Sequence, residues 1–280
     1  MNRRSLLASS AVIGIALVSG SVLAQQQGAA PTPQTLRQQT VGAWAVISNT
    51  LPQLIPTLGA SPQGYLFYAG SGKFAIVLEN ADRPRNAGRS DGVFASFGTW
   101  TVDEASKTMT ARTEGSMTSS LEGNDRKTSM TINGDIRRVT GPENTTNVYR
   151  RVAPLPQGSA FRQGLLGAWE IVSLSPGGTA GTNPKGYLML GSSARYVLAG
   201  AAPNRPKSDK PSGDGFVAQF GTWSIDEGAK TFSLRRTGAL NQSIEGTETK
   251  ATYSVNGNEM RLTSADGKTT SVYRHLAAIQ

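Results

Sequence analysis

Residues 97–104 read FGTWTVDE, and residues 220–227 read FGTWSIDE. The aromatic, small and β-branched residues end in two acidic residues, which is typical of a strand that runs out into a turn. The flanking sequence also recurs, because Gly42-Ala43-Trp44 is matched by Gly167-Ala168-Trp169. The offset between matching residues stays between 122 and 125, for example 186 − 64 = 122 and 167 − 42 = 125. The pattern therefore predicts a tandem duplication.

Each copy contains about eight short segments with strand character, and neither copy contains a convincing helix. Phe74, Ile76 and Leu78 alternate with smaller residues and should share the inner face of one strand. Asn133-Gly134 and Asn256-Gly257 are strong hairpin signals, since both central residues of a type I′ turn need positive φ. The sequence predicts an all-β fold of two tandem antiparallel up-and-down β-barrels of about eight strands each, with an open sandwich as the alternative.

The predicted order of segments begins with an export signal at residues 1–24. Arg3-Arg4 precede an apolar run that is too short to span a bilayer, and Ala24 is a small residue of the kind that signal peptidase favours. The twin arginines also fit the export route of folded proteins, so a periplasmic or secreted location is expected. A flexible linker at 25–39, a first barrel at 40–152, a Pro-rich linker at 153–163 and a second barrel at 164–277 complete the expected order. No further segment could cross a membrane as a helix.

Two residue types that many enzymes depend on are rare here. The chain has no cysteine and one histidine, His275. The lack of cysteine excludes disulfides, thiolate metal sites and cysteine nucleophiles. A Ser-His-acid triad needs a nearby histidine, so the first copy cannot hold one and the second could only through His275. The composition argues against a hydrolase or metalloenzyme, and nothing in it indicates a cofactor.

The net charge is +9, and 9 − 2 = +7 once Arg3 and Arg4 of the expected signal are removed. A basic surface attracts phosphates and anionic lipid head groups, so weak contact with an anionic envelope surface is a possible role. No basic run alternates with aromatic residues as a nucleic-acid groove would, so no nucleic-acid partner is expected.

Several short motifs occur in the same order in both copies: Gly-Ala-Trp, Gly-Tyr-Leu, an Arg-Pro loop, Phe-Gly-Thr-Trp with Asp-Glu, and Val-Tyr-Arg. Together they resemble the bacterial and fungal lipocalin-like domain family. This resemblance implies that the first-strand tryptophan of each barrel packs under a terminal arginine as a structural pair. Trp44 would pair with Arg150 or Arg151, and Trp169 with Arg274.

The wall of each barrel could line a cavity for a small hydrophobic molecule, because ligand sites are mostly apolar with a few polar groups. The alternative is that side chains fill both barrels completely. The candidate lining residues are Tyr65, Phe67, Phe74 and Ile76 in the first copy and Tyr187, Met189, Tyr196 and Leu198 in the second.

Two pairs of equivalent arginines are further candidates for ligand binding. Arg112 and Arg235 lie on strands and could hold a ligand carboxylate if they point inward, with Glu122 and Glu245 available as partners. The alternative is that they point outward into solvent. Arg83 and Arg205 lie in a Pro-containing loop and could gate the barrel mouth or hold an anionic group. Their alternative role is to anchor the loop on backbone carbonyls.

Three functional hypotheses follow. The first is an exported non-catalytic binding protein with two barrels for a small apolar or amphipathic ligand. The second is an isomerase or cyclase acting on a non-polar substrate, which needs a tyrosine, a carboxylate or an Arg-Glu pair inside a barrel. The third is an envelope structural or interaction module with filled barrels and its function on the outer surface. The sequence does not indicate the oligomeric state.

Overall fold

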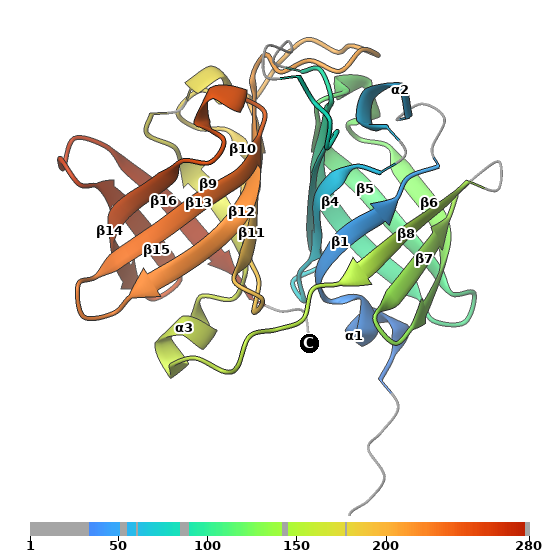
Figure 1. Cartoon of the computed structure of the whole chain (residues 1–280), viewed down its shortest axis with the longest axis horizontal. Coiled ribbons are helices and arrows are strands. Elements are labelled where there is room, and N and C mark those ends of the chain that lie inside the picture. Colours follow the sequence, from blue (N-terminus) through green and yellow to red (C-terminus); the bar gives the residue numbers. More distant parts are fainter. Residues whose placement is uncertain are drawn as a thin grey trace, which may run out of the picture. The chain divides into compact units, whose positions relative to one another are not determined.

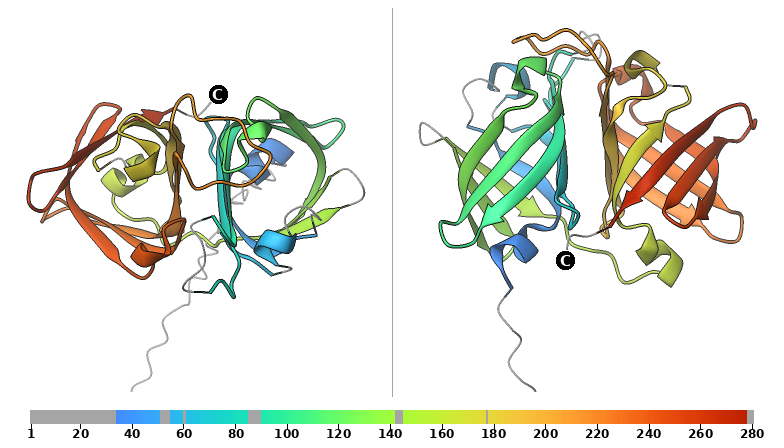
Figure 2. Two further views of the ribbon diagram at one scale, coloured as in Figure 1. Left: turned by 90° about the horizontal axis from the view of Figure 1, so that it is seen from above. Right: turned by 180° about the vertical axis from the view of Figure 1, so that it is seen from behind.

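The computed structural model describes residues 34–50, 55–59, 61–84, 90–141, 145–176 and 178–277. The expected export signal and most of the first linker lie outside these residues. Two closed barrels, each with eight antiparallel strands in sequence order, confirm the predicted fold class. Figures 1 and 2 show the two sheets, each curling around its own interior.

The first barrel closes because β1 pairs with β2 on one side and with β8 on the other. Trp44 of β1 lies opposite Leu66 of β2 and Arg151 of β8. Its strands are β1 (Gly42–Ser48), β2 (Gln63–Tyr68), β3 (Lys73–Glu79), β4 (Val93–Asp103), β5 (Thr108–Ser116), β6 (Asp125–Asn133), β7 (Ile136–Thr140) and β8 (Thr146–Arg151).

The second barrel repeats this plan, and β9 joins β10 to β16. Closure of both sheets leaves no unpaired strand edge, which removes a common route to aggregation. Its strands are β9 (Gly167–Ser173), β10 (Lys185–Leu190), β11 (Arg195–Ala201), β12 (Phe216–Asp226), β13 (Thr231–Ala239), β14 (Glu248–Asn256), β15 (Glu259–Ser264) and β16 (Thr270–Leu276).

The repeated Phe-Gly-Thr-Trp stretch lies in β4 and β12, where the register shifts at Phe97/Gly98 and at Phe220/Gly221. The glycine is needed because a Cβ on Gly98 would lie 1.9 Å from the carbonyl oxygen of Arg112. Trp100 then points into the first barrel, and its indole Nε1 donates to the carbonyl oxygens of Lys73 at 3.1 Å and Ala69 at 3.2 Å.

Short helices occur in segments whose sequence carries no helical signal. α1 (Leu36–Thr40) begins inside the stretch expected to be a flexible linker, and α3 (Ala160–Gly164) overlaps the end of the Pro-rich linker. Helices of this length are unstable alone and depend on caps from elsewhere. Glu104 supplies one, since its carboxylate accepts hydrogen bonds from the backbone N–H of Leu36 and Arg37 at 2.7 and 2.8 Å. The other short helices are α2 (Ile55–Leu58), η1 (Ser119–Leu121), η3 (Gly178–Ala180) and η4 (Gln242–Ile244).

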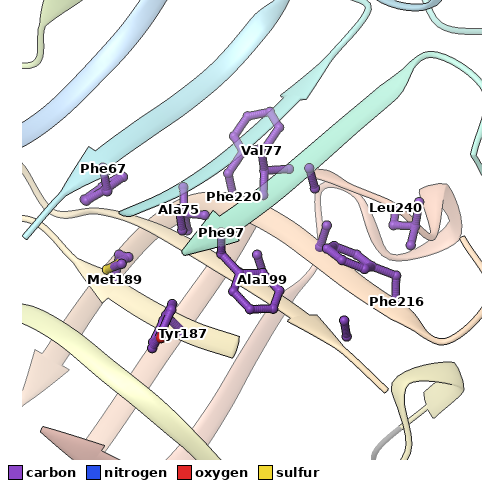
Figure 3. Packing of buried hydrophobic residues seen from close by; sticks show 14 of the residues in the cluster. Phe67, Ala75, Val77, Phe97, Tyr187, Met189, Ala199, Phe216, Phe220 and Leu240 are labelled. Carbon is purple, nitrogen blue, oxygen red and sulfur yellow. The ribbon is translucent and has the colours of Figure 1, made fainter. Parts of the chain in front are cut away.

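The outer faces of β2, β3, β4, β10, β11 and β12 share one buried apolar cluster, which joins the two barrels (Figure 3). Phe97 of β4 meets Tyr187 of β10 edge to face, with ring centroids 5.6 Å apart. Tyr65 meets Phe220 in the same way at 5.6 Å. These strands are therefore buried on both faces, toward their own barrel and toward the shared cluster. Both barrels lie in one compact unit that begins at Gln34.

Candidate functional site

The interior of the first barrel contains a cavity of about 710 Å³. This volume lies in the range of about 300–1,000 Å³ typical of small-molecule sites. Residues from all eight strands of this barrel line it, and its walls are mainly apolar. The apolar residues that line it are Val46, Leu66, Tyr68, Phe74, Ile76, Leu78, Phe94, Met109, Ala111, Val139 and Tyr149.

The closed end of this barrel is sealed by Trp44, which is fully buried. The indole Nε1 donates to the carbonyl oxygen of Thr40 in α1 at 2.8 Å. The guanidinium of Arg151 lies 4.3 Å from the centre of the Trp44 ring, and its Nη1 and Nη2 donate to the carbonyl oxygens of Val41 and Gln39. Burial lowers the pKa of Arg151 from its ordinary value.

In the first copy the structure selects Arg151 from the two expected arginines, whereas the expected pair of the second copy needs a correction of one residue. Arg150 is exposed and lies opposite Ala45, so Arg151 stacks on Trp44. Arg274 lies opposite Glu170, and its Nη1 is 3.6 Å from a carboxylate oxygen of that residue. His275 instead lies opposite Trp169, with ring centroids 4.6 Å apart. Directly opposite residues on antiparallel strands share a face, so a shift of one residue reverses the direction of the side chain.

Arg137 on β7 is fully buried and lines the cavity near its closed end. Its Nη2 donates to the hydroxyl oxygen of Tyr68 at 3.0 Å and contacts the sulfur of Met109 at 3.2 Å. The guanidinium lies 4.5 Å from the ring centre of Tyr68, 5.6 Å from that of Tyr149 and 5.8 Å from that of Trp44. Three aromatic faces therefore surround this cation.

Tyr149 on β8 adds a phenol to the same end of the cavity. Burial, with a smaller contribution from Tyr68, raises the pKa of Tyr149 to about 12, although Arg137 and Arg126 act in the opposite direction. The hydroxyl is therefore protonated at neutral pH and can donate a hydrogen bond, but it is a poor base.

The mouth of the cavity is polar and includes residues of both copies. Thr118, Ser120 and Asn124 come from the segment around η1. Asp209 and Pro211 come from the loop between β11 and β12 of the second copy. This loop is attached to the first barrel by hydrogen bonds: Ser120 N–H to the carbonyl oxygen of Ser208 at 3.0 Å, Ser119 Oγ to that of Pro206 at 2.8 Å, and Ser212 N–H to that of Met117 at 3.0 Å.

The interior of the second barrel is filled more completely at the matching positions. Its core cluster holds sixteen buried residues, against nine in the first barrel, among the residues that the structure describes. Leu234 stands where Ala111 lines the first cavity, and Phe232 where Met109 does. Gln219 takes the place of Ser96 and accepts a 2.5 Å hydrogen bond from Nε of Arg236. Larger side chains thus occupy space that the first copy leaves open.

The eight predicted lining residues divide into two groups. Phe74 and Ile76 line the cavity of the first barrel, and Tyr196 and Leu198 lie in the interior cluster of the second. The prediction of inward positions is wrong for Tyr65, Phe67, Tyr187 and Met189, which pack in the cluster between the barrels. Leu66 and Tyr68 point inward instead, since side chains alternate along a strand.

The two strand arginines do not enter a barrel. Arg112 is 58% exposed and pairs with Asp125 at 3.1 Å, and Arg235 is also exposed. The outward alternative therefore describes both. Neither contacts its proposed partner: Glu122 pairs with Arg205 at 2.8 Å, and Glu245 with Arg83 at 3.4 Å. These residues therefore do not form an Arg-Glu pair inside a barrel, which is one of the three groups named for the isomerase hypothesis.

Arg83 and Arg205 connect the two copies. Arg83 donates to the carbonyl oxygens of Ala239 and Leu240 at 3.0 and 3.3 Å, so it anchors its loop on the backbone of the second barrel. Arg205 pairs with Glu122 of the first barrel and stacks over Phe216 at 5.0 Å. Their expected role as ligand contacts is replaced by a role in the interface between the barrels.

One ionisable side chain in this interface should make stability depend on pH. Glu79 at the end of β3 is 3% exposed, and burial, followed by repulsion from Glu245, raises its pKa from 4.5 to about 7. The folded state therefore binds a proton that the unfolded state has released between these values. The stabilisation is complete at low pH and is lost as the pH rises through about 7.

We expect the denaturation midpoint of the wild-type protein to fall between pH 5 and pH 8, and the Glu79→Gln variant to lose most of this dependence. Guanidinium titrations at pH 5 and pH 8 measure the denaturation midpoints of the wild-type and variant proteins. Glu170→Gln, at a carboxylate that is 45% exposed, is the control and should leave the pH dependence intact. If the denaturation midpoint changes equally with pH in the wild-type and Glu79→Gln proteins, a group other than Glu79 causes the pH dependence.

Sequence reasoning missed Arg137. The available signal was the second copy, where Met260 occupies the matching position and is fully buried. When one copy has a charged residue where the other has an apolar one, either the charged side chain points outward into solvent or a charge is buried. The structure shows a buried charge, because Arg137 is fully buried and its neighbour Arg138 on β7 is exposed.

In the described ranges no group of three or more histidine, aspartate or glutamate side chains has the geometry of a metal site. None of the helices described is long and apolar enough to cross a membrane. The exposed large apolar side chains, Ile47, Leu121 and Leu155, lie on β1, η1 and the segment between the barrels. No protein-family model matches the sequence, and a search of the curated proteins found no match.

Proposed function

We propose that the chain is an exported, non-catalytic binding protein of lipocalin-like type whose first barrel holds a small apolar or amphipathic molecule. The observation that carries this proposal is the cavity of about 710 Å³ with apolar walls, closed at one end by Trp44. An apolar ligand in such a cavity gains roughly 25 cal/mol for each Å² of surface removed from water. A periplasmic or secreted location belongs to the same proposal and is supported by the sequence of residues 1–24 alone.

The second barrel has a supporting role in this proposal. Its larger interior side chains reduce the free space, and its loop around Asp209 and Pro211 forms part of the mouth of the first cavity. The duplication would then provide one binding barrel and one barrel that completes and stabilises it. Under this proposal only the first barrel binds a ligand, whereas the sequence led us to expect one ligand for each barrel.

A neutral apolar dye whose fluorescence rises in apolar surroundings tests the proposal. We expect one dye molecule to bind per chain, and the Ala111→Leu variant to weaken binding at least tenfold, because the larger leucine side chain takes up space in the cavity that Ala111 lines. Met109→Phe should act in the same direction. Both changes introduce the residue that the second copy carries at that position, so they suit this fold.

Arg112→Leu is the matched control. It places a leucine at the residue next to Ala111 on the same strand, where the side chain faces solvent. We expect its dye affinity to equal that of the wild-type protein. Equal affinity in all variants would place the dye outside the first barrel, and absence of binding by the wild-type protein would contradict the proposed function.

A further inference from the structure

Arg137 carries hydrogen-bond donors that the protein leaves unused. Its Nη2 is bonded to Tyr68, but Nε and Nη1 have no hydrogen-bond partner among the described residues. Nε bears one N–H and Nη1 bears two, so three donors are unsatisfied on a fully buried cation that lines the cavity. Buried charges in proteins are normally paired, and an unpaired one is strongly unfavourable.

The surrounding groups offset this charge only in part. The faces of Tyr68, Tyr149 and Trp44 attract the guanidinium, but cation–π contacts do not satisfy N–H donors. Tyr68 accepts one hydrogen bond, and the phenol of Tyr149 is protonated at neutral pH. No carboxylate among the described residues contacts Arg137.

The acidic residues that line the cavity lie far from this cation. Asp125 and Asp209 are both exposed at the mouth, and Asp125 already pairs with Arg112. Arg137 lies opposite Ile132 on β6, which is 132 − 125 = 7 residues from Asp125. Seven residues of extended strand span about 24 Å. Among the residues that the structure describes, none supplies the negative charge that would balance Arg137, and a molecule that enters the cavity can supply it.

We infer that the first barrel takes an amphipathic carboxylate, with its carboxylate on Arg137 and its apolar chain along the wall toward the mouth. One buried cation balances one negative charge, which favours a carboxylate over a phosphate dianion. The exposed Arg126 at the mouth adds positive potential along the entry path. Tyr149 can donate a further hydrogen bond to the same carboxylate. The second barrel has Met260 at the matching position and should show no such preference.

This inference rests on the proposed function, and a calorimetric comparison separates the two. The full chain is titrated with decanoate, with decanol and with decyl phosphate at one ionic strength. A hydrogen-bonded ion pair of this kind is worth about 10- to 100-fold in affinity. We expect decanoate to bind more tightly than decanol by this factor, and more tightly than decyl phosphate.

The Arg137→Met variant reproduces the second copy and should remove the preference, so that decanoate and decanol bind to it with similar affinity. Arg137→Gln should behave alike and guards against a folding defect of the first variant. Equal binding of decanoate and decanol by the wild-type protein would overturn the inference but leave the proposed function standing. Tighter binding of decyl phosphate would overturn the choice of carboxylate, and failure of all three ligands to bind would contradict the proposed function itself.

Discussion

Replacing Trp44 by alanine is expected to lower the free energy of unfolding by about 3–5 kcal/mol. The indole is fully buried, and its removal leaves a void at the closed end of the first barrel. The change also removes the ring beneath Arg151 and the hydrogen bond to the carbonyl oxygen of Thr40, which holds α1 in place. Urea denaturation followed by circular dichroism measures the loss.

Trp44→Phe is the matched variant, because it keeps an aromatic ring and loses the indole N–H. This variant should lower the free energy of unfolding by a smaller amount, about 1–2 kcal/mol, since only one hydrogen bond and a few ring atoms are lost. A loss below about 1 kcal/mol for Trp44→Ala would contradict the role of this residue as the floor of the barrel.

Replacing Phe97 by alanine is expected to cost a similar amount, about 3–5 kcal/mol, but through a different part of the molecule. Phe97 is fully buried on the outer face of β4 and packs between Gly115 of its own barrel and Tyr187 and Phe216 of the other. Its loss weakens the cluster that joins the barrels. We therefore expect the unfolding transition to broaden or to separate into two steps.

Differential scanning calorimetry detects this change, because a single transition becomes two when the barrels unfold independently. Phe94→Ala is the control, since Phe94 lies on the same strand but faces the cavity of the first barrel. It should lower stability without uncoupling the two barrels. A single, equally sharp transition for Phe97→Ala would show that the apolar cluster does not couple them.

The strand order and the barrel fold could be predicted because the signals are local. Alternation, Asn-Gly turns and the repeated Phe-Gly-Thr-Trp stretch act within a few residues of each other. The short helices could not be predicted, because α1 depends on Glu104, which is 68 residues away in sequence from Leu36.

Which face of a strand points inward was harder to predict for strands that are buried on both faces. β2 carries Tyr65 and Phe67 on one face and Leu66 and Tyr68 on the other, and both sets are apolar. Alternation cannot distinguish them when a second barrel covers the outer face. The residues chosen as cavity lining accordingly include four that pack in the shared cluster, three aromatic residues and Met189.

The candidate site depends on one residue that pattern reasoning passed over. Arg137 is next to Arg138, and only the register of β7 decides which of the two is buried. The expected binding arginines, Arg112 and Arg235, have the right chemistry but face solvent. The sequence therefore predicted arginines as candidate ligand contacts but did not include Arg137, which lines the cavity.

The central claim, that a ligand occupies the first barrel and not the second, is tested most directly by methyl NMR during a titration with decanoate. We predict that the methyl signals of Ile76, Val46 and Ala111 shift as decanoate is added, whereas those of Leu198 and Leu234 in the second barrel do not. Shifts confined to the second barrel, or unchanged signals in both barrels at millimolar decanoate, would contradict the account.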